Sequence, residues 1–172
     1  MTPTRPPPPA PTDAAPRAEG FERVADALRQ LGHEPPPRWL EVAARTSQEA
    51  ADALGVALGQ IAKSVVFRRR DDDQAVLVIT SGDRRVDEQR LAACVGEVAR
   101  ADAQFVKSRT GFAIGGVSPV GLAGEPTLLL DRELQRFGEI WAAAGHPNGV
   151  FRLSPQDLQR LTGAQWADVV QP

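Results

Sequence analysis

The chain has 172 residues, of which 42% are hydrophobic, so it can bury one sizeable core and we expect a single domain. Its formal net charge of −2 gives no overall positive field for nucleic acid, so such a partner must be argued from local charge. One cysteine and two histidines exclude an internal disulfide and argue against a metal centre built on these residues. No apolar run could span a bilayer, no signal peptide is apparent, and we expect a cytoplasmic protein.

The N-terminal segment is rich in proline. Residues 1–20 hold seven of the fifteen prolines, and we predict a disordered tail there and a folded domain over residues 21–172. Apolar residues then recur at helical spacing, namely Phe21, Val24, Leu28 and Leu31. Gly32 should end this helix, and residues 39–43 are predicted to form a short strand.

A capped helix and a β-hairpin come next. Thr46 to Glu49 form a capping box, which predicts a helix that ends near Gly55. The β-branched runs 64–67 and 75–79 predict two strands, joined by residues 68–73. Three arginines in that connection are followed at once by three aspartates, which favours a self-neutralised turn over a phosphate-binding patch.

The second half of the chain mixes helices and strands. Helices are expected from Asp87, over Asp102–Arg109, from Asp131 and from Ser154-Pro155, and strands over 127–130, 140–143, 150–153 and 167–170. This order has no regular βαβ rhythm, and it predicts an α+β domain with a mixed, largely antiparallel sheet. Cys94 lies in the apolar stretch 91–95 and is predicted to be an inert, buried thiol.

A glycine-rich loop over residues 110–121 is the first candidate for chemistry. It holds four glycines, Gly111, Gly115, Gly116 and Gly121, which allow a ligand to approach the backbone closely. Amides around Gly115 and Gly116 could converge on a carbonyl oxygen or a phosphate. The spacing matches neither the phosphate loop nor the dinucleotide fingerprint. The alternative interpretation is a bulged connection that uses glycine only for its dihedral angles.

Lys63 is the second candidate. The chain has eighteen arginines and only two lysines, and Lys63 stands at the start of an apolar strand. There its ammonium could hold a phosphate or polarise an ester carbonyl, or simply extend to solvent. Asp83 is expected in a turn, and His146 lies in a glycine-containing loop, where contact with a ligand is common.

Several segments together carry a family resemblance. They are the helix 46–54, the strand entry 61–67, the segment 81–87, the loop 110–121, and the stretches 153–158 and 161–164. These segments resemble the YbaK and prolyl-tRNA-synthetase-associated family of aminoacyl-tRNA deacylases, over residues 21–172. The resemblance implies a mixed sheet or distorted barrel flanked by helices. It also implies hydrolysis of the ester between an amino acid and the terminal adenosine of tRNA, without cofactor or metal.

The resemblance assigns roles to individual residues. Lys63 matches the family's functional lysine, and the glycine loop supplies amides that stabilise an oxyanion. The predicted catalytic residues are Lys63, Gly115, Gly116 and Val117. The predicted substrate-binding residues are Thr46, Ser64, Asp83, Phe112, Ser118, Pro119, Gly121 and His146. No side chain stands out as a general base, and a ribose hydroxyl of the tRNA is expected to activate the water.

The substrate follows from smaller details. His146-Pro147 is similar to a pair in the alanine-specific branch, but Ser64 stands where that branch has asparagine. We therefore expect a small amino acid, such as alanine, serine, threonine or cysteine, on tRNA for proline or on another tRNA. Prolyl-tRNA synthetase is expected as a further partner. Two other functions fit the sequence, namely a tRNA- or nucleotide-binding module without catalysis and a pocket for a free small metabolite.

Overall fold

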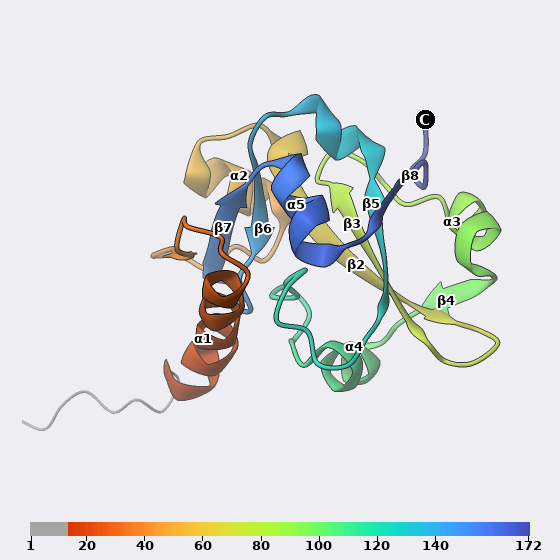
Figure 1. Cartoon of the computed structure of the whole chain (residues 1–172), viewed down its shortest axis with the longest axis horizontal. Helices are drawn as coiled ribbons and strands as arrows, with labels where there is room; N and C mark the ends of the chain where they lie inside the picture. Colours follow the sequence, from red (N-terminus) through yellow and green to blue (C-terminus); the bar gives the residue numbers. More distant parts are fainter. Residues whose placement is uncertain (1–13) are drawn as a thin grey trace, which may run out of the picture.

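The computed structural model describes residues 14–172, with side chains from residue 19 onward. The helices are α1 (Ala14–Gln30), α2 (Ser47–Leu54), α3 (Glu88–Val95), α4 (Ala103–Thr110) and α5 (Pro155–Thr162), with 3-10 turns η1 (Leu58–Gln60) and η2 (Arg132–Arg136). The strands are β1 (Arg38–Trp39), β2 (Ile61–Arg69), β3 (Ala75–Ser81), β4 (Val98–Arg100), β5 (Thr127–Asp131), β6 (Ile140–Ala143), β7 (Gly149–Leu153) and β8 (Gln165–Ala167). Figure 1 shows the helices arranged around one sheet.

The helices begin where the sequence offers side-chain caps. Thr46 accepts a hydrogen bond from the Glu49 amide at the start of α2, as the capping box predicts. Asp87, Asp102 and Ser154 accept equivalent bonds at α3, α4 and α5. The helix predicted from Asp131 is only the 3-10 turn η2.

The first helix is longer than predicted. It begins at Ala14 rather than near Phe21, so residues 14–20 are part of α1. Pro16 lies in the first turn, where a missing amide hydrogen costs no intrahelical bond. Residues 1–13, the rest of the predicted tail, lie outside the described residues.

The sheet is mixed and open. Its strand order is β1-β7-β6-β2-β3-β5-β8, with β4 also paired to β2. Pairs β1–β7, β6–β7, β2–β3 and β2–β4 are antiparallel, whereas β2–β6, β3–β5 and β5–β8 are parallel. The predicted α+β class with a mixed sheet is confirmed, and of the two alternatives the open sheet forms rather than the barrel.

Some local predictions differ from the structure. The strand predicted over 39–43 is limited to β1, and the one predicted over 167–170 is β8, followed by an isolated bridge between Val86 and Val170. Strand β4 was not predicted. Cys94 is exposed, because α3 buries Leu91 and turns Cys94 to solvent, so the predicted core thiol is wrong.

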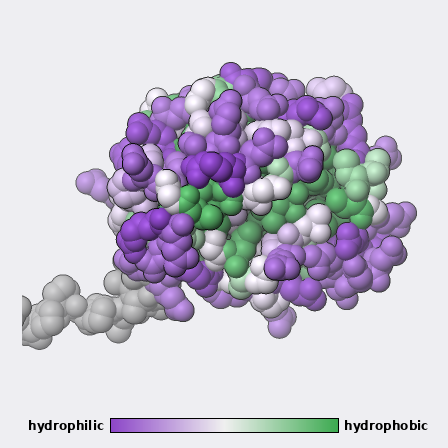
Figure 2. Space-filling view, viewed as in Figure 1, coloured by the Kyte–Doolittle hydropathy of each residue, from purple (hydrophilic) through white to green (hydrophobic). Residues whose placement is uncertain are grey.

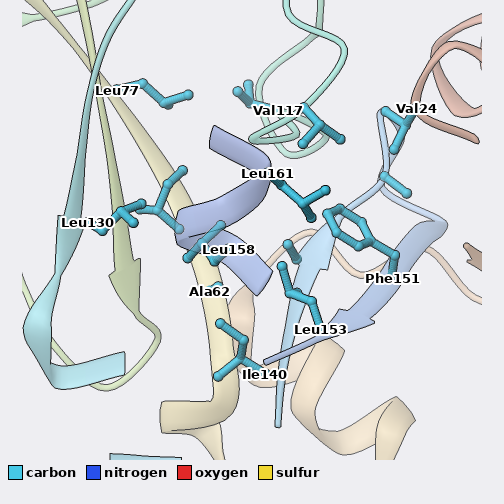
Figure 3. Packing of buried hydrophobic residues seen from close by; sticks show 14 of the residues in the cluster. Val24, Ala62, Leu77, Val117, Leu130, Ile140, Phe151, Leu153, Leu158 and Leu161 are labelled. Carbon is cyan, nitrogen blue, oxygen red and sulfur yellow. The ribbon is translucent and has the colours of Figure 1, made fainter. Parts of the chain in front are cut away.

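The core lies on both faces of the sheet. Strand β3 is buried along its whole length, with Leu77 and Ile79 in one hydrophobic cluster and Val76 and Val78 in another. The first cluster lies under α1, α5 and the glycine loop, and Figure 3 shows the α5 leucines among side chains of the sheet and Val117 of the loop. Figure 2 shows apolar surface in the middle of this view inside a rim of hydrophilic side chains.

One side of strand β2 is only partly covered. Strand β6 pairs with Ile61 and Ala62, and β4 pairs with Phe67 to Arg69, so residues 63–66 pair with β3 alone. The Arg70 amide donates to the Glu97 carbonyl, on the side of β4, and the Arg69 amide donates to the Gln74 carbonyl, on the side of β3. Since main-chain groups alternate along a strand, those of residues 64 and 66 face the uncovered side. We call this stretch the β2 gap.

Candidate functional site

A cavity of about 310 Å³ opens at the β2 gap, and we call it the main cavity. Its wall is formed by β2, β6, the start of α2, the tip of the glycine loop and the segment around His146. The predicted site residues that line it are Thr46, Lys63, Ser64, Gly115, Val117 and His146. Residues from five separate parts of the chain therefore meet at one place.

Lys63, half-buried on β2, lines the main cavity. Burial lowers the pKa of Lys63 below its usual value, and the nearby positive charge of Arg85 lowers it further, against Asp83 and Asp131. No described residue forms an ion pair or a hydrogen bond with its ammonium group. The side chain is thus a partly desolvated cation available to an anionic or carbonyl oxygen of a ligand.

A buried carboxylate stands behind Lys63. Asp131, at the end of β5, is fully buried and accepts hydrogen bonds from the Thr80 hydroxyl at 2.9 Å and the Ser81 amide at 3.1 Å. It also caps η2 through the Glu133 amide. The sequence predicted only that a helix begins at Asp131. The available signal was a lone carboxylate at the end of an otherwise apolar strand.

Asp83 does not line the main cavity. Its carboxylate accepts hydrogen bonds from Arg136 Nη2 at 2.8 Å and from the Ser81 hydroxyl at 2.9 Å. The hydrogen bond from Arg136 holds the pKa of Asp83 below its usual range. Asp83, predicted to bind substrate, therefore lies near Lys63 but outside the wall of the main cavity.

Two residues of the glycine loop whose amides have no described acceptor line the main cavity. Gly115, at an exposed tip with φ of 91°, and Val117 line the main cavity, and no described residue accepts a hydrogen bond from either amide. The amide of Gly116 instead donates to the carbonyl of Ala113 at 3.0 Å. A Cβ on Gly116 would lie 2.9 Å from the backbone of His146, so only glycine allows this close approach.

Of the other predicted loop residues, Phe112, Ser118 and Pro119 are buried. Phe112, Ser118 and Pro119 do not line the main cavity; Phe112 lies in the core, and the Ser118 hydroxyl accepts from the Val120 amide at 3.2 Å. Gly121, with φ of 72°, packs against α1. These residues shape and support the loop, and the structure does not bring them to the cavity.

Arg23 of α1, which sequence reasoning did not single out, holds the start of the loop. Its guanidinium donates to the Gly111 carbonyl at 3.0 Å and lies 4.3 Å from the centre of the Phe112 ring. Lys107 donates to the same carbonyl at 3.2 Å. The first helix therefore fixes the loop against the body of the domain.

His146 lies beside the loop tip. Its ring stacks on Trp39 with centroids 4.8 Å apart, and its Nδ1 accepts from the Asn148 amide at 3.0 Å. This bond places the proton of the neutral ring on Nε2. His146 in this form offers no lone pair to remove a proton from water.

Two buried polar atoms at the cavity lack partners. The hydroxyl of Ser64 and the indole nitrogen of Trp141 make no hydrogen bond with any described residue, and both residues line the main cavity. Buried polar groups are normally satisfied, so such atoms mark a wall that a polar ligand could complete. The other wall residues are largely small and apolar, including Ala44, Ala50, Ala62, Ala142 and Ala143.

In residues 14–172, no three or more histidine, cysteine, aspartate or glutamate side chains gather in a way that could hold a metal ion. In the same part of the chain, no helix is long and apolar enough to cross a membrane.

The chain is similar to several proteins of known sequence or structure. The chain is 37% identical over 131 residues to YwhH of Bacillus subtilis, covering 75% of this chain and 83% of that protein. It is 28% identical to EbsC of Enterococcus faecalis, named as a candidate Cys-tRNA(Pro)/Cys-tRNA(Cys) deacylase, covering 72% of this chain and 76% of that one. A crystal structure described as a candidate trans-editing enzyme for prolyl tRNA synthetase is 39% identical, with a TM-score of 0.83, covering 89% and 98%. The model of the aminoacyl-tRNA editing domain matches residues 41–161, and this chain belongs to that family.

Proposed function

We propose that this protein hydrolyses the ester bond of tRNA mischarged with a small amino acid. The observation that carries the proposal is the main cavity, which Lys63, Gly115 and Val117 line together with several alanines. The names of its relatives EbsC and the trans-editing structure support tRNA as the partner, with prolyl-tRNA synthetase as the source of the mischarged substrate.

The reaction needs few protein groups. Water attacks the ester carbonyl carbon, the bond from that carbon to the ribose oxygen breaks, and a proton passes to the ribose oxygen. The Gly115 and Val117 amides stabilise the negative charge on the carbonyl oxygen, and Lys63 holds the ester or adjacent phosphate. Because His146 Nδ1 is already bonded to the Asn148 amide, a ribose hydroxyl of the tRNA orients the water.

The cavity wall sets the choice of amino acid. The larger wall residues Ile61, Trp141 and Val150 are the ones that limit the size of the amino acid in the main cavity. Such a pocket separates substrates that differ by one methylene by only about 1–3 kcal/mol. The unpartnered Ser64 hydroxyl and Trp141 indole nitrogen favour a substrate that brings its own hydroxyl, thiol or amino group.

A deacylation panel tests this proposal. Wild-type protein and Lys63→Met are incubated under single-turnover conditions with tRNA carrying alanine, serine, threonine, cysteine or proline. The wild type should release at least one of the small residues, and Lys63→Met should lose at least about 100-fold in rate while it melts cooperatively. Binding of charged tRNA without ester loss would instead indicate a tRNA-binding module.

A further inference from the structure

A second cavity lies on the other side of Lys63, and we call it the basic groove. Its volume is about 480 Å³, and Lys63 lines both this groove and the main cavity. Its walls come from β2, β4, the segment before α3 and the end of the chain, which is tied down where the Gln171 amide donates to the Arg85 carbonyl at 2.9 Å. The groove therefore continues from the proposed ester site along β2.

The groove carries a local excess of positive charge. Lys63, Arg85 and Arg100 line it, against a single carboxylate, Glu88. This excess is opposite in sign to the net charge of −2 of the whole chain. The sign of the groove is the one that attracts an anionic ligand.

The side chains of the two arginines of the groove have no partner among the described residues. Neither Arg85 nor Arg100 forms an ion pair, a side-chain hydrogen bond or a ring contact with any described residue. Most other described arginines are paired, as in Arg68 with Asp73 at 2.6 Å and Arg136 with Asp83 at 2.8 Å. Their guanidinium groups therefore remain available to oxygens of a ligand.

The positively charged side chains are arranged along a line rather than gathered at one point. Lys63 and Phe67 lie on the same face of β2, since side chains alternate along a strand, and Arg100 pairs with Phe67 in register. Lys63 and Phe67 are four positions apart on β2, so the line spans roughly 13 Å. Burial and the charge of Arg85 lower the pKa of Lys63, which agrees with Arg85 standing near the start of the line.

The floor of the groove offers polar and apolar contacts together. It includes Val65, Val66 and Ala101, and the main-chain groups of Val66 face the β2 gap without a neighbouring strand. A row of cations beside apolar surface and open main-chain groups suits a polyanion with flat bases, and is longer than one free phosphate requires.

We propose that the basic groove binds the phosphodiester backbone of the single-stranded 3′ end of the RNA whose aminoacyl ester occupies the main cavity. Arg85 and Arg100 hold consecutive phosphates, and Lys63 marks the point where the strand enters the main cavity. This inference rests on the proposed function, since it takes the occupant of the main cavity to be an aminoacyl ester of RNA.

The test compares two substrates that share the ester. One is an aminoacylated tRNA minihelix, and the other is the same amino acid esterified to adenosine, which has no phosphate. The double variant Arg85→Gln/Arg100→Gln is measured against the wild type and against Arg70→Gln. Arg70 is an exposed arginine on the same β-hairpin whose side chain also lacks a partner, but it does not line the groove.

The expected result is a change in preference. In the double variant, the ratio of kcat/KM for minihelix to kcat/KM for the adenosine ester should fall about tenfold or more. The slope of log kcat/KM against log salt concentration for the minihelix should become shallower by about 1.4, or roughly 0.7 for each lost phosphate contact. Arg70→Gln should alter the ratio by less than twofold.

Several outcomes would overturn the groove. The first is a ratio of kcat/KM values in the double variant equal to that of the wild type. The second is an equal fall of this ratio in Arg70→Gln, which would show a non-specific effect of charge. If the wild type hydrolyses neither substrate, the proposed function fails by itself. In that case, binding of the labelled minihelix is measured by fluorescence anisotropy over a series of salt concentrations. A shallower slope of log Kd against log salt concentration in the double variant alone supports RNA binding in the groove, and equal slopes refute it.

Discussion

Alanine at position 116 would place a methyl carbon 2.9 Å from both the Cα and the nitrogen of His146, and 3.2 Å from the carbonyl carbon of Gly145. These neighbours are backbone atoms and cannot rotate away, so the loop tip must retreat by about 0.5–1 Å to regain ordinary contact. Overpacking of this kind costs about 1–3 kcal/mol. At roughly 2–4 °C for each kcal/mol in a domain of this size, Gly116→Ala should lower Tm by about 2–12 °C.

The same retreat carries the Gly115 and Val117 amides away from the ester. Misplacement of a catalytic group by about 1 Å can cost roughly 100-fold in rate. Single-turnover deacylation and thermal unfolding are therefore measured together. The matched control is Gly138→Ala, since a Cβ there meets nothing within 4 Å. It should deacylate at the wild-type rate.

Two results would refute the reasoning about this loop. If Gly116→Ala melts several degrees lower but deacylates within threefold of the wild type, the amides of the loop tip do not stabilise the oxyanion. If its Tm equals that of Gly138→Ala, the close approach to His146 does not constrain the loop.

Three further predictions concern charge and exposure. Because burial lowers the pKa of Lys63, its charged form opposes folding, so Lys63→Met should raise the free energy of unfolding measured in urea at pH 7. This gain in stability should shrink as the pH rises from the pKa of folded Lys63 towards the usual 10.5. A gain that stays constant over this pH range would contradict burial as its cause. Asp83→Asn should cost about 0.5–1 kcal/mol at pH 7 through loss of the Arg136 pair. That cost is fully present above about pH 4, the pKa of an unfolded aspartate, and should vanish as the pH falls through the lowered pKa of folded Asp83. Equal urea unfolding curves for the variant and the wild type at pH 7 would contradict this prediction. Cys94 should react with a thiol reagent in the native protein as readily as in urea, whereas a lag until unfolding would contradict its exposure.

Local signals in the sequence predicted most of the elements. The capping residues Thr46, Asp87 and Ser154 mark their helices because each accepts bonds from amides two or three residues away. The hairpin β2–β3 follows from two β-branched runs, and its turn is neutralised within itself by Arg69 and Asp72 at 2.8 Å. Such interactions join neighbours along the chain, so composition and spacing suffice to find them.

The candidate site was predicted unevenly. Lys63, Thr46, Ser64, Gly115, Val117 and His146 all line the main cavity, as a shared site requires. Gly116 supports the loop instead of presenting its amide, because a turn bond to Ala113 already uses that hydrogen. Asp83 is held by Arg136, which lies far away in sequence, so a turn signal at 81–85 could not show it.

The sequence by itself determined the α+β class, the capped helices, the hairpin and the pair of chemical features at Lys63 and the glycine loop. The tertiary structure decided what lies beside them. Strand β6 pairs in parallel with the start of β2, and β4 pairs antiparallel with its end, so residues 63–66 are left uncovered beside both cavities. Pairing of β5 with β3, the neighbour of β2, brings Asp131 near Lys63, and Arg85 also lies close enough to act on its charge. These contacts join distant segments, and their free energy comes from burial that no local pattern records.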